Sequence, residues 1–154
     1  MAIRIIKTEE DDILRKQSKK VDKISKRIIT LLDDMNDTLE KANGLGLAAP
    51  QVGILKKIFV TRLDDEITEF INPVIMIEKG EQLEAEGCLS IPGVFGIVKR
   101  PLEVKIEAQN RDGEIFVMEA KELLARVISH ENDHLKGILF KDKIERYINE
   151  EEFE

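Results

Sequence analysis

The stretch LLARVISHENDHL, residues 123–135, combines helical apolar spacing with both histidines of the chain. Its apolar residues recur at three- and four-residue steps, which predicts an amphipathic helix over about Ala120–Lys136. Steps of three and four from Val127 reach His130 and His134, so both histidines are expected on the face that points into the core. We therefore expect this helix to form the centre of the fold.

The pentad HENDH, residues 130–134, matches the metal-binding pattern HExxH. Histidines four residues apart on a helix can bind one metal ion, with Glu131 beside the open coordination position. Two histidines placed at random in 154 positions would have this spacing only about one time in a hundred. Asp133 has two readings, as a carboxylate that orients a ligating imidazole or as a solvated helix residue.

The third ligand must come from outside the helix. Proteases with HExxH add a downstream His or Glu, but this chain has no third histidine and Gly137 follows His134 closely. Cys88, within EGCLS (residues 86–90), is the only thiol, and a thiolate with two imidazoles leaves one position for water. Taken alone, Cys88 would be read as a small buried apolar residue. The pentad favours the ligand reading.

A run of small residues, GLGLAAPQ, occupies positions 44–51. Gly44 and Gly46 would let an extended peptide approach the backbone closely. The Gln51 side-chain amide either donates to an oxyanion beside the metal or caps the loop. The run lacks the Gly-Lys-Ser/Thr ending of a phosphate-binding loop.

Working outward, a second amphipathic helix is predicted ahead of this run. Its apolar residues recur from Ile24 to Ala42, with Asp22 placed to cap the start and Asn43-Gly44 to end it. The tail over Lys141–Glu154 has three basic and six acidic residues and is predicted to be a short, frayed helix.

Three β-rich stretches are predicted as strands: Lys57–Arg62, Thr68–Ile77 and Gly96–Ala108. A hairpin loop is expected at 110–113, with Gly113 at positive φ. Because the strands follow one another without intervening helices, they should be antiparallel. The predicted fold is α+β, one domain over residues 1–154, with antiparallel β-sheets packed around the central HExxH helix and an N-terminal amphipathic helix.

Composition excludes several classes of protein. The net charge is −7 and aromatic residues make up 5%, which argues against a nucleic-acid binder. No apolar stretch is long enough to span a membrane, and the first residues lack the pattern of a signal peptide. With a single cysteine, the chain is expected to be cytoplasmic.

Three segments together resemble the hallmark motifs of peptide deformylases. GLGLAAPQ, EGCLS and HENDHL occur in the same order as in that family, and LRK (14–16), INP (71–73) and LLAR (123–126) are similar too. The resemblance covers nearly the whole chain. It implies a hydrolase that removes the formyl group from N-formylmethionine at the start of nascent bacterial polypeptides, releasing formate, and that associates transiently with the ribosome.

The resemblance also implies roles for individual residues. A metal-bound water would attack the formyl carbon, with Glu131 as general acid/base. Ferrous iron is the usual ion of the family, although a set of two nitrogens and one sulfur also accepts Zn²⁺, Ni²⁺ or Co²⁺. The metal ligands would be Cys88, His130 and His134, and the oxyanion donors Gln51 and the Leu89 N–H.

Substrate binding is expected to involve apolar side chains and backbone groups. Leu45, Leu123 and Val127 are candidates for a pocket that holds the methionine side chain, and each could equally be core packing. Backbone groups of Leu45, Gly46 and Gly87 could pair with the substrate as an added strand.

By analogy, Glu86 and Arg100 form a charge pair that fixes the cysteine loop. Two features depart from the family pattern: Ser129 stands where many members have Gln, and the acidic tail replaces a longer basic helix that some members use at the ribosome. Neither departure touches the expected chemistry.

Two other functions remain open at this point. A zinc-dependent peptidase would also use HExxH and an activated water, and it would cleave unformylated peptides. A non-catalytic homologue with a structural metal is the second alternative. It should have lost a ligand or the general base, yet all of these residues are present.

Overall fold

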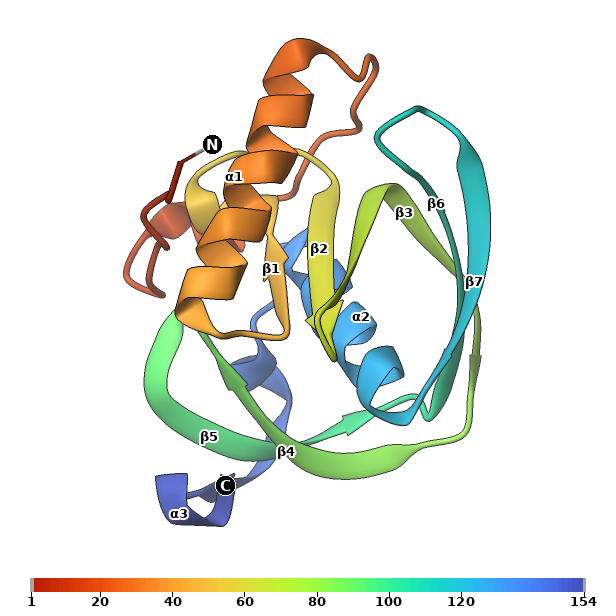
Figure 1. Cartoon of the computed structure of the whole chain (residues 1–154). Coiled ribbons are helices and arrows are strands. Elements are labelled where there is room, and N and C mark those ends of the chain that lie inside the picture. The colour runs from red at the N-terminus through yellow and green to blue at the C-terminus, as the bar shows by residue number, and fades with distance from the viewer. Residues whose placement is uncertain (1, 154) are drawn as a thin grey trace.

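Residues 2–153, the part of the chain that the computed structural model describes, form two antiparallel sheets around a buried helix (Figure 1). The larger sheet has the order β1 (Gly46–Ala48), β2 (Ile58–Leu63), β3 (Glu66–Lys79), β6 (Glu103–Gln109) and β7 (Ile115–Lys121). The smaller sheet has the order β4 (Gln82–Cys88), β5 (Ile91–Arg100) and β8 (Ile144–Ile148). The α+β class with antiparallel sheets agrees with the prediction.

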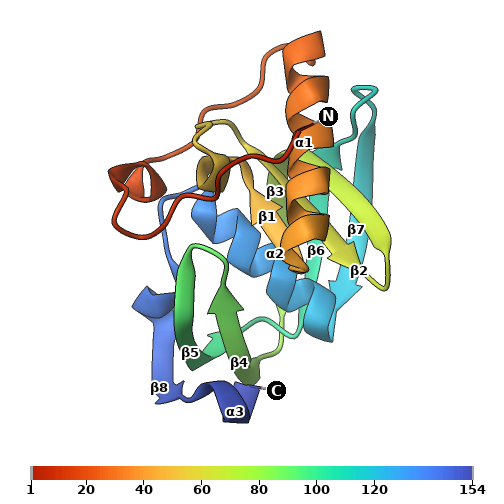
Figure 2. The same ribbon diagram turned by 60° about the vertical axis from the view of Figure 1, so that its left-hand side comes forward.

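Two helices, α1 (Lys26–Ala42) and α2 (Glu122–His134), pack against different sides of the larger sheet. Side chains alternate between the faces of a strand, so Ile58 and Val60 join the α1 cluster while Phe59 joins the α2 cluster. Figure 2 shows α2 between the two sheets. Within residues 2–153, no helix is both long enough and apolar enough to cross a membrane. The remaining helices are short: η1 (Asp12–Arg15), η2 (Ala49–Val52), η3 (Phe140–Lys143) and α3 (Glu150–Phe153).

The start of α1 differs from the prediction that Asp22 caps the helix. The helix begins after Ser25, which is extended, and Asn72 holds the backbone upstream of it at Val21. The Val21 N–H donates to Asn72 Oδ1 at 2.8 Å, and Asn72 Nδ2 donates to the Val21 carbonyl at 2.9 Å. The end is as predicted: Asn43 adopts a left-handed conformation with φ 54°.

The predicted strand over Gly96–Ala108 is wrong as a single element. The chain leaves the smaller sheet at Arg100 and enters the larger sheet at Glu103, with Pro101 between them. Proline has no N–H for a sheet hydrogen bond, which favours a break there. Strand β4 was not predicted, whereas the hairpin loop has Gly113 at φ 82° as predicted.

The predicted helix over Lys141–Glu154 is also wrong for most of its length. Residues 144–148 form β8, which pairs with β5, and only α3 is α-helical. A Cβ atom at Gly96 would lie 2.6 Å from Ile144 Cγ2, so this glycine lets the tail pack closely on β5. The edge of β5 therefore overrides the weak local helical preference of the tail.

Candidate active site

Three potential metal ligands meet at the centre of the molecule. Cys88 ends β4, and His130 and His134 lie in the last turns of α2. Their ligand atoms all lie within 4.8 Å of one another, and Cys88 Sγ is 3.4 Å from His134 Nε2. A tetrahedral site with typical metal–sulfur and metal–nitrogen bonds separates such atoms by about 3.5 Å. The predicted trio therefore fits a divalent metal ion.

Glu86, on β4, orients one of these imidazoles. His130 Nδ1 lies 2.8 Å from Glu86 Oε1, which leaves Nε2 free to face the cysteine. Arg100 donates to both carboxylate oxygens at 2.8 and 2.9 Å, and Arg126 also donates to Oε2. Burial acts to raise the pKa of Glu86, but the hydrogen bonds from Arg100 and His130 outweigh it and hold the pKa well below its ordinary value.

Asp133 fits neither of its two sequence readings. Its Oδ2 accepts from Arg100 Nη1 at 2.6 Å and lies 2.8 Å from Lys143 Nζ. Asp133 is buried and holds Arg100 in place, while the carboxylate that contacts an imidazole is Glu86. The expected Glu86–Arg100 pair is present, and it extends through Arg100 to Asp133.

Glu131 lies on α2 beside the glycine-rich run. Its Oε1 is buried and has no hydrogen-bond partner among residues 2–153. Burial raises the pKa of Glu131 to about 7, although the nearby His130 acts in the opposite direction. A Cβ atom at position 46 would lie 2.6 Å from Glu131 Oε2, so Gly46 makes room for this carboxyl group. A group with such a pKa can both accept and release a proton near neutral pH.

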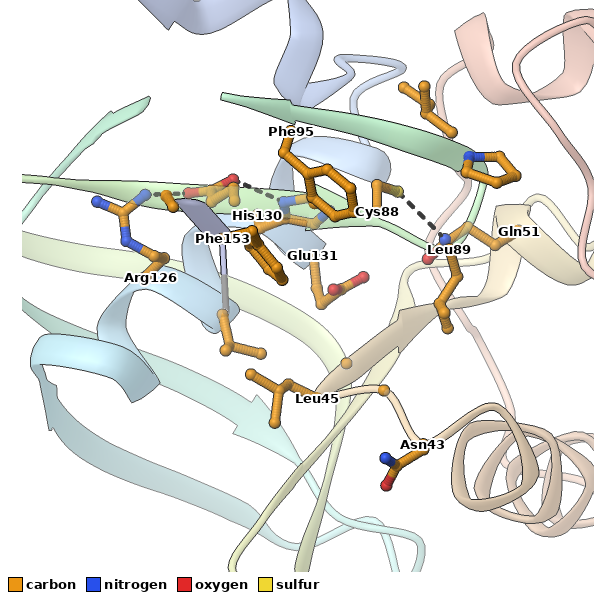
Figure 3. Close-up of a pocket in the computed structure, with 18 of the residues that line it drawn as sticks. Asn43, Leu45, Gln51, Cys88, Leu89, Phe95, Arg126, His130, Glu131 and Phe153 are labelled. Carbon is orange, nitrogen blue, oxygen red and sulfur yellow. Dashed lines mark hydrogen bonds and ion pairs between the residues drawn. The ribbon is translucent and has the colours of Figure 1, made fainter. Parts of the chain in front are cut away.

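Gln51, in η2, has its side-chain amide oriented by two contacts. Its Oε1 accepts from the Ala48 N–H at 2.9 Å, and its Nε2 donates to Ser90 Oγ at 3.0 Å. The same Nε2 lies 3.7 Å from Cys88 Sγ. A dashed line in Figure 3 marks this contact. The amide N–H₂ group therefore points toward the metal ligands, and Leu89, the next residue after Cys88, lines the same cavity.

A cavity of about 420 Å³ adjoins these groups and is lined by every predicted substrate-binding residue. Val127 is buried, whereas Leu123 is 49% exposed and lies at the rim. Strands β1 and β4 are each the edge strand of their sheet, so both have unpaired backbone groups available. The predicted substrate-binding residues that line the cavity are Leu45, Gly46, Gly87, Leu123 and Val127.

Comparison with known proteins gives the family. The family model described as polypeptide deformylase matches residues 3–150. The chain belongs to the polypeptide deformylase family. It is 58% identical over 154 residues to the peptide deformylase of Acetivibrio thermocellus. The aligned region covers 100% of this chain and 91% of that protein. It is also similar to two crystal structures of peptide deformylases.

The first of these crystal structures is that of a peptide deformylase from Legionella pneumophila, with a TM-score of 0.90 and 39% identity. The match covers 92% of this chain and 86% of that chain. The second, from Thermotoga maritima, has a TM-score of 0.90 and 36% identity over 92% of this chain and 97% of that chain. This deformylase is therefore a formyl-removing hydrolase that acts on nascent formylated peptides, in a family of metalloenzymes. The family assignment favours this activity over the peptidase and the non-catalytic homologue.

Several deformylase site residues were not identified from the sequence. Ser90 belongs to the EGCLS motif and Arg126 to the LLAR segment. Each is a polar residue close in sequence to a predicted metal ligand, Cys88 or His130, and this closeness could have identified both. Phe95 and Phe153 also line the cavity, but no local pattern connects them. They meet only because β8 pairs with β5 and returns the chain to the site.

Proposed function

We propose that the Cys88, His130 and His134 site holds the metal and that Glu131 is the general acid/base for removal of the formyl group from N-terminal formylmethionine. The observation that supports this most is the buried Glu131 carboxyl group without a partner on Oε1, beside a trio spaced for one ion. A divalent ion at such a site supplies Lewis acidity and lowers the pKa of a water ligand toward neutrality.

Each remaining group then has a defined task. Glu131 accepts a proton from the attacking water and passes it to the leaving amine, which yields formate and a free N-terminus. Gln51 Nε2 and the Leu89 N–H donate to the formyl oxygen as negative charge develops on it. Cys88 acts as a ligand rather than a nucleophile, because a thiolate that binds a metal has its lone pair engaged.

The cavity supports a binding mode for the substrate. The methionine side chain lies among Leu45, Leu123 and Val127, and the peptide backbone pairs with Leu45, Gly46 and Gly87 between the edges of β1 and β4. Backbone pairing does not depend on the identity of the following side chains. The enzyme therefore accepts many sequences after the methionine.

Ferrous iron is the proposed ion, bound once per chain, with Zn²⁺, Ni²⁺ or Co²⁺ able to replace it. The donor set of one sulfur and two nitrogens accepts all of these ions. The whole chain acts as one catalytic domain in the cytoplasm. It meets its nascent substrates by a transient association with the ribosome.

The test is anaerobic formate release from a short formyl-methionyl peptide by wild type and Glu131→Gln at matched, measured metal content. We expect Glu131→Gln to lower kcat by about 10²- to 10⁴-fold, because proton transfer is lost while the metal ligands are kept. Glu122→Gln is the matched control, since Glu122 lies on the same helix with an exposed side chain.

Two results would contradict the proposal. One is formate release by Glu131→Gln at the wild-type rate. The other is a wild-type enzyme that, fully loaded with metal, releases no formate but cleaves the unformylated peptide, which would indicate a peptidase.

A further inference from the structure

The last described residues of the chain return to the substrate cavity. Strand β8 pairs with β5, with Ile148 opposite Phe95. The chain then turns at Asn149, whose Oδ1 accepts from the Glu152 N–H at 2.9 Å while its own N–H donates to Glu152 Oε1 at 3.4 Å. This reciprocal cap starts α3 and directs Phe153 back along β5. Figure 2 shows α3 at the foot of the smaller sheet, below the tail of the β4 arrow.

Phe153 forms an aromatic stack in the wall of the cavity. Its ring centroid lies 4.5 Å from that of Phe95, with an angle of 29° between the ring planes. A Cβ atom at Gly87 would lie 2.8 Å from the Phe95 ring and 3.7 Å from Phe153 Cζ. The glycine therefore makes room for Phe95, and the position of Phe95 supports Phe153. Both rings line the cavity (Figure 3).

The ring narrows the cavity without filling it. The cavity keeps about 420 Å³ with Phe153 in place, and the ring itself is 41% exposed. The other proposed walls for the methionine side chain, Leu45, Leu123 and Val127, are aliphatic. A thioether makes favourable contacts with the edge of an aromatic ring, which an aliphatic wall does not offer.

We propose that Phe153 is a specificity-determining residue whose ring forms the aromatic wall for the side chain of the substrate's N-terminal methionine. This inference rests on the proposed methionine site and adds to it a residue from the tail, which was expected to be a short, frayed helix. Phe95 is a positioning residue that acts through Phe153. Because the ring has no polar group to offer the reacting atoms, it contributes to substrate affinity rather than to the chemical step.

The first experiment measures formate release from two peptides that differ only in formylmethionine or formylnorleucine, where a methylene replaces the sulfur. The variants are Phe153→Ala and Phe153→Leu, with Tyr147→Ala as the control, since Tyr147 is an exposed aromatic residue on β8 outside the cavity lining. Phe153→Ala should raise KM for the methionyl peptide by about tenfold with kcat within about twofold. Phe153→Leu should reduce the preference for methionine over norleucine by about 2- to 10-fold.

The second experiment separates this inference from the proposed mechanism. Binding of the formyl-methionyl peptide is measured by calorimetry in the Glu131→Gln background, where turnover is slow. Phe153→Ala should raise Kd by about the same tenfold. This measurement does not depend on turnover. A wild-type enzyme that releases no formate would therefore overturn the proposed mechanism but leave the role of Phe153 to be decided by Kd.

Four outcomes would overturn the role of Phe153. The first is an unchanged KM and Kd in Phe153→Ala, and the second is a lowered KM in the same variant, which would mean that the ring obstructs the site. The third is an equal rise of KM in Tyr147→Ala. The fourth is an unchanged preference for methionine over norleucine in Phe153→Leu. Thermal unfolding of each variant checks that it folds.

Discussion

Each side of the cavity has one buried glutamate, and the two glutamates differ in their partners and in their pKa values. Glu86, on the β4 side, is 5% exposed, and Glu131, on the side of Gly46, is 4% exposed. Glu86 interacts with two arginines and His130, whereas Glu131 Oε1 has no partner in the described part of the chain. Equal burial thus gives a low pKa on one side and a pKa of about 7 on the other. Partners, rather than burial, decide which carboxyl group is structural and which is reactive.

Replacing each glutamate by glutamine should give the largest difference in stability between the two sides. Glu86→Gln removes the carboxylate that buried Arg126 contacts and leaves Asp133 as the ion-pair partner of Arg100, so we expect the free energy of unfolding to fall by about 3–5 kcal/mol. Glu131→Gln should not lower the free energy of unfolding, because no charged partner loses its contact and the cost of ionising a buried carboxyl group with a raised pKa is removed. Urea denaturation of the metal-free proteins at pH 7.5 measures both values.

The same pair of variants should differ in metal binding. In Glu86→Gln the His130 ring loses its charged acceptor, and metal affinity is expected to fall by about 10- to 100-fold. Glu131→Gln should bind the metal as wild type does. Equal destabilisation of the two variants, or equal metal affinity, would contradict the division of roles.

Gly46 offers a smaller change that affects the reactive side alone. A methyl group there would lie 2.6 Å from Glu131 Oε2 and must displace the carboxyl group. Because displacement of a catalytic group by about 1 Å can cost about 10²-fold, Gly46→Ala should lower kcat by roughly that factor while metal content stays unchanged. Formate release under anaerobic conditions measures the loss.

A double-mutant cycle tests whether the methyl group acts through Glu131. In the Glu131→Gln background, Gly46→Ala should have little further effect on kcat, since the proton-transfer group is already absent. Independent, additive losses would mean that Gly46 matters to substrate binding instead.

The parts of the site that were predictable are local in sequence. Histidines four residues apart must share a helix face, so the pentad predicted the position of His130 and His134 once the helix was identified. The partner of His130 could not be found in this way, because Glu86 lies 44 residues earlier on a strand that was not predicted. Asp133 could not be assigned either, since its role depends on where β5 brings Arg100.

The fold shows the same limit. Helix α1 was predictable from its periodicity because it packs one face on the sheet. The tail was mispredicted because β8 depends on the free edge of β5 and on the space left by Gly96, neither of which is a property of the tail itself. Phe153 reaches the cavity only as a consequence of that pairing.

Asp34, on α1, extends the comparison to a carboxylate far from the metal ligands. It is buried, and it accepts from the Ala2 N–H at 2.7 Å and from Arg4 Nε at 2.9 Å. Burial acts to raise the pKa of Asp34, but these hydrogen bonds outweigh it and lower the pKa below its ordinary value of 3.8. If partners decide the charge state, Asp34 should behave as Glu86 does.

The sign of the pH effect follows from this lowered pKa. A carboxyl group whose pKa is lower in the folded protein stabilises the fold above its unfolded pKa, and this stabilisation is lost as the pH falls through the folded value. Asp34→Asn should therefore be less stable than wild type by about 1–2 kcal/mol at pH 7, a modest figure because Arg4 is partly exposed. The difference should persist down to about pH 4 and shrink below it. Urea denaturation at pH 7, 5, 4 and 3 measures it, with Asp37→Asn on the same helix as the control, since Asp37 is not bonded to Ala2 or Arg4. A difference that grows as the pH falls would show that burial, not the partners, controls the charge of this carboxylate.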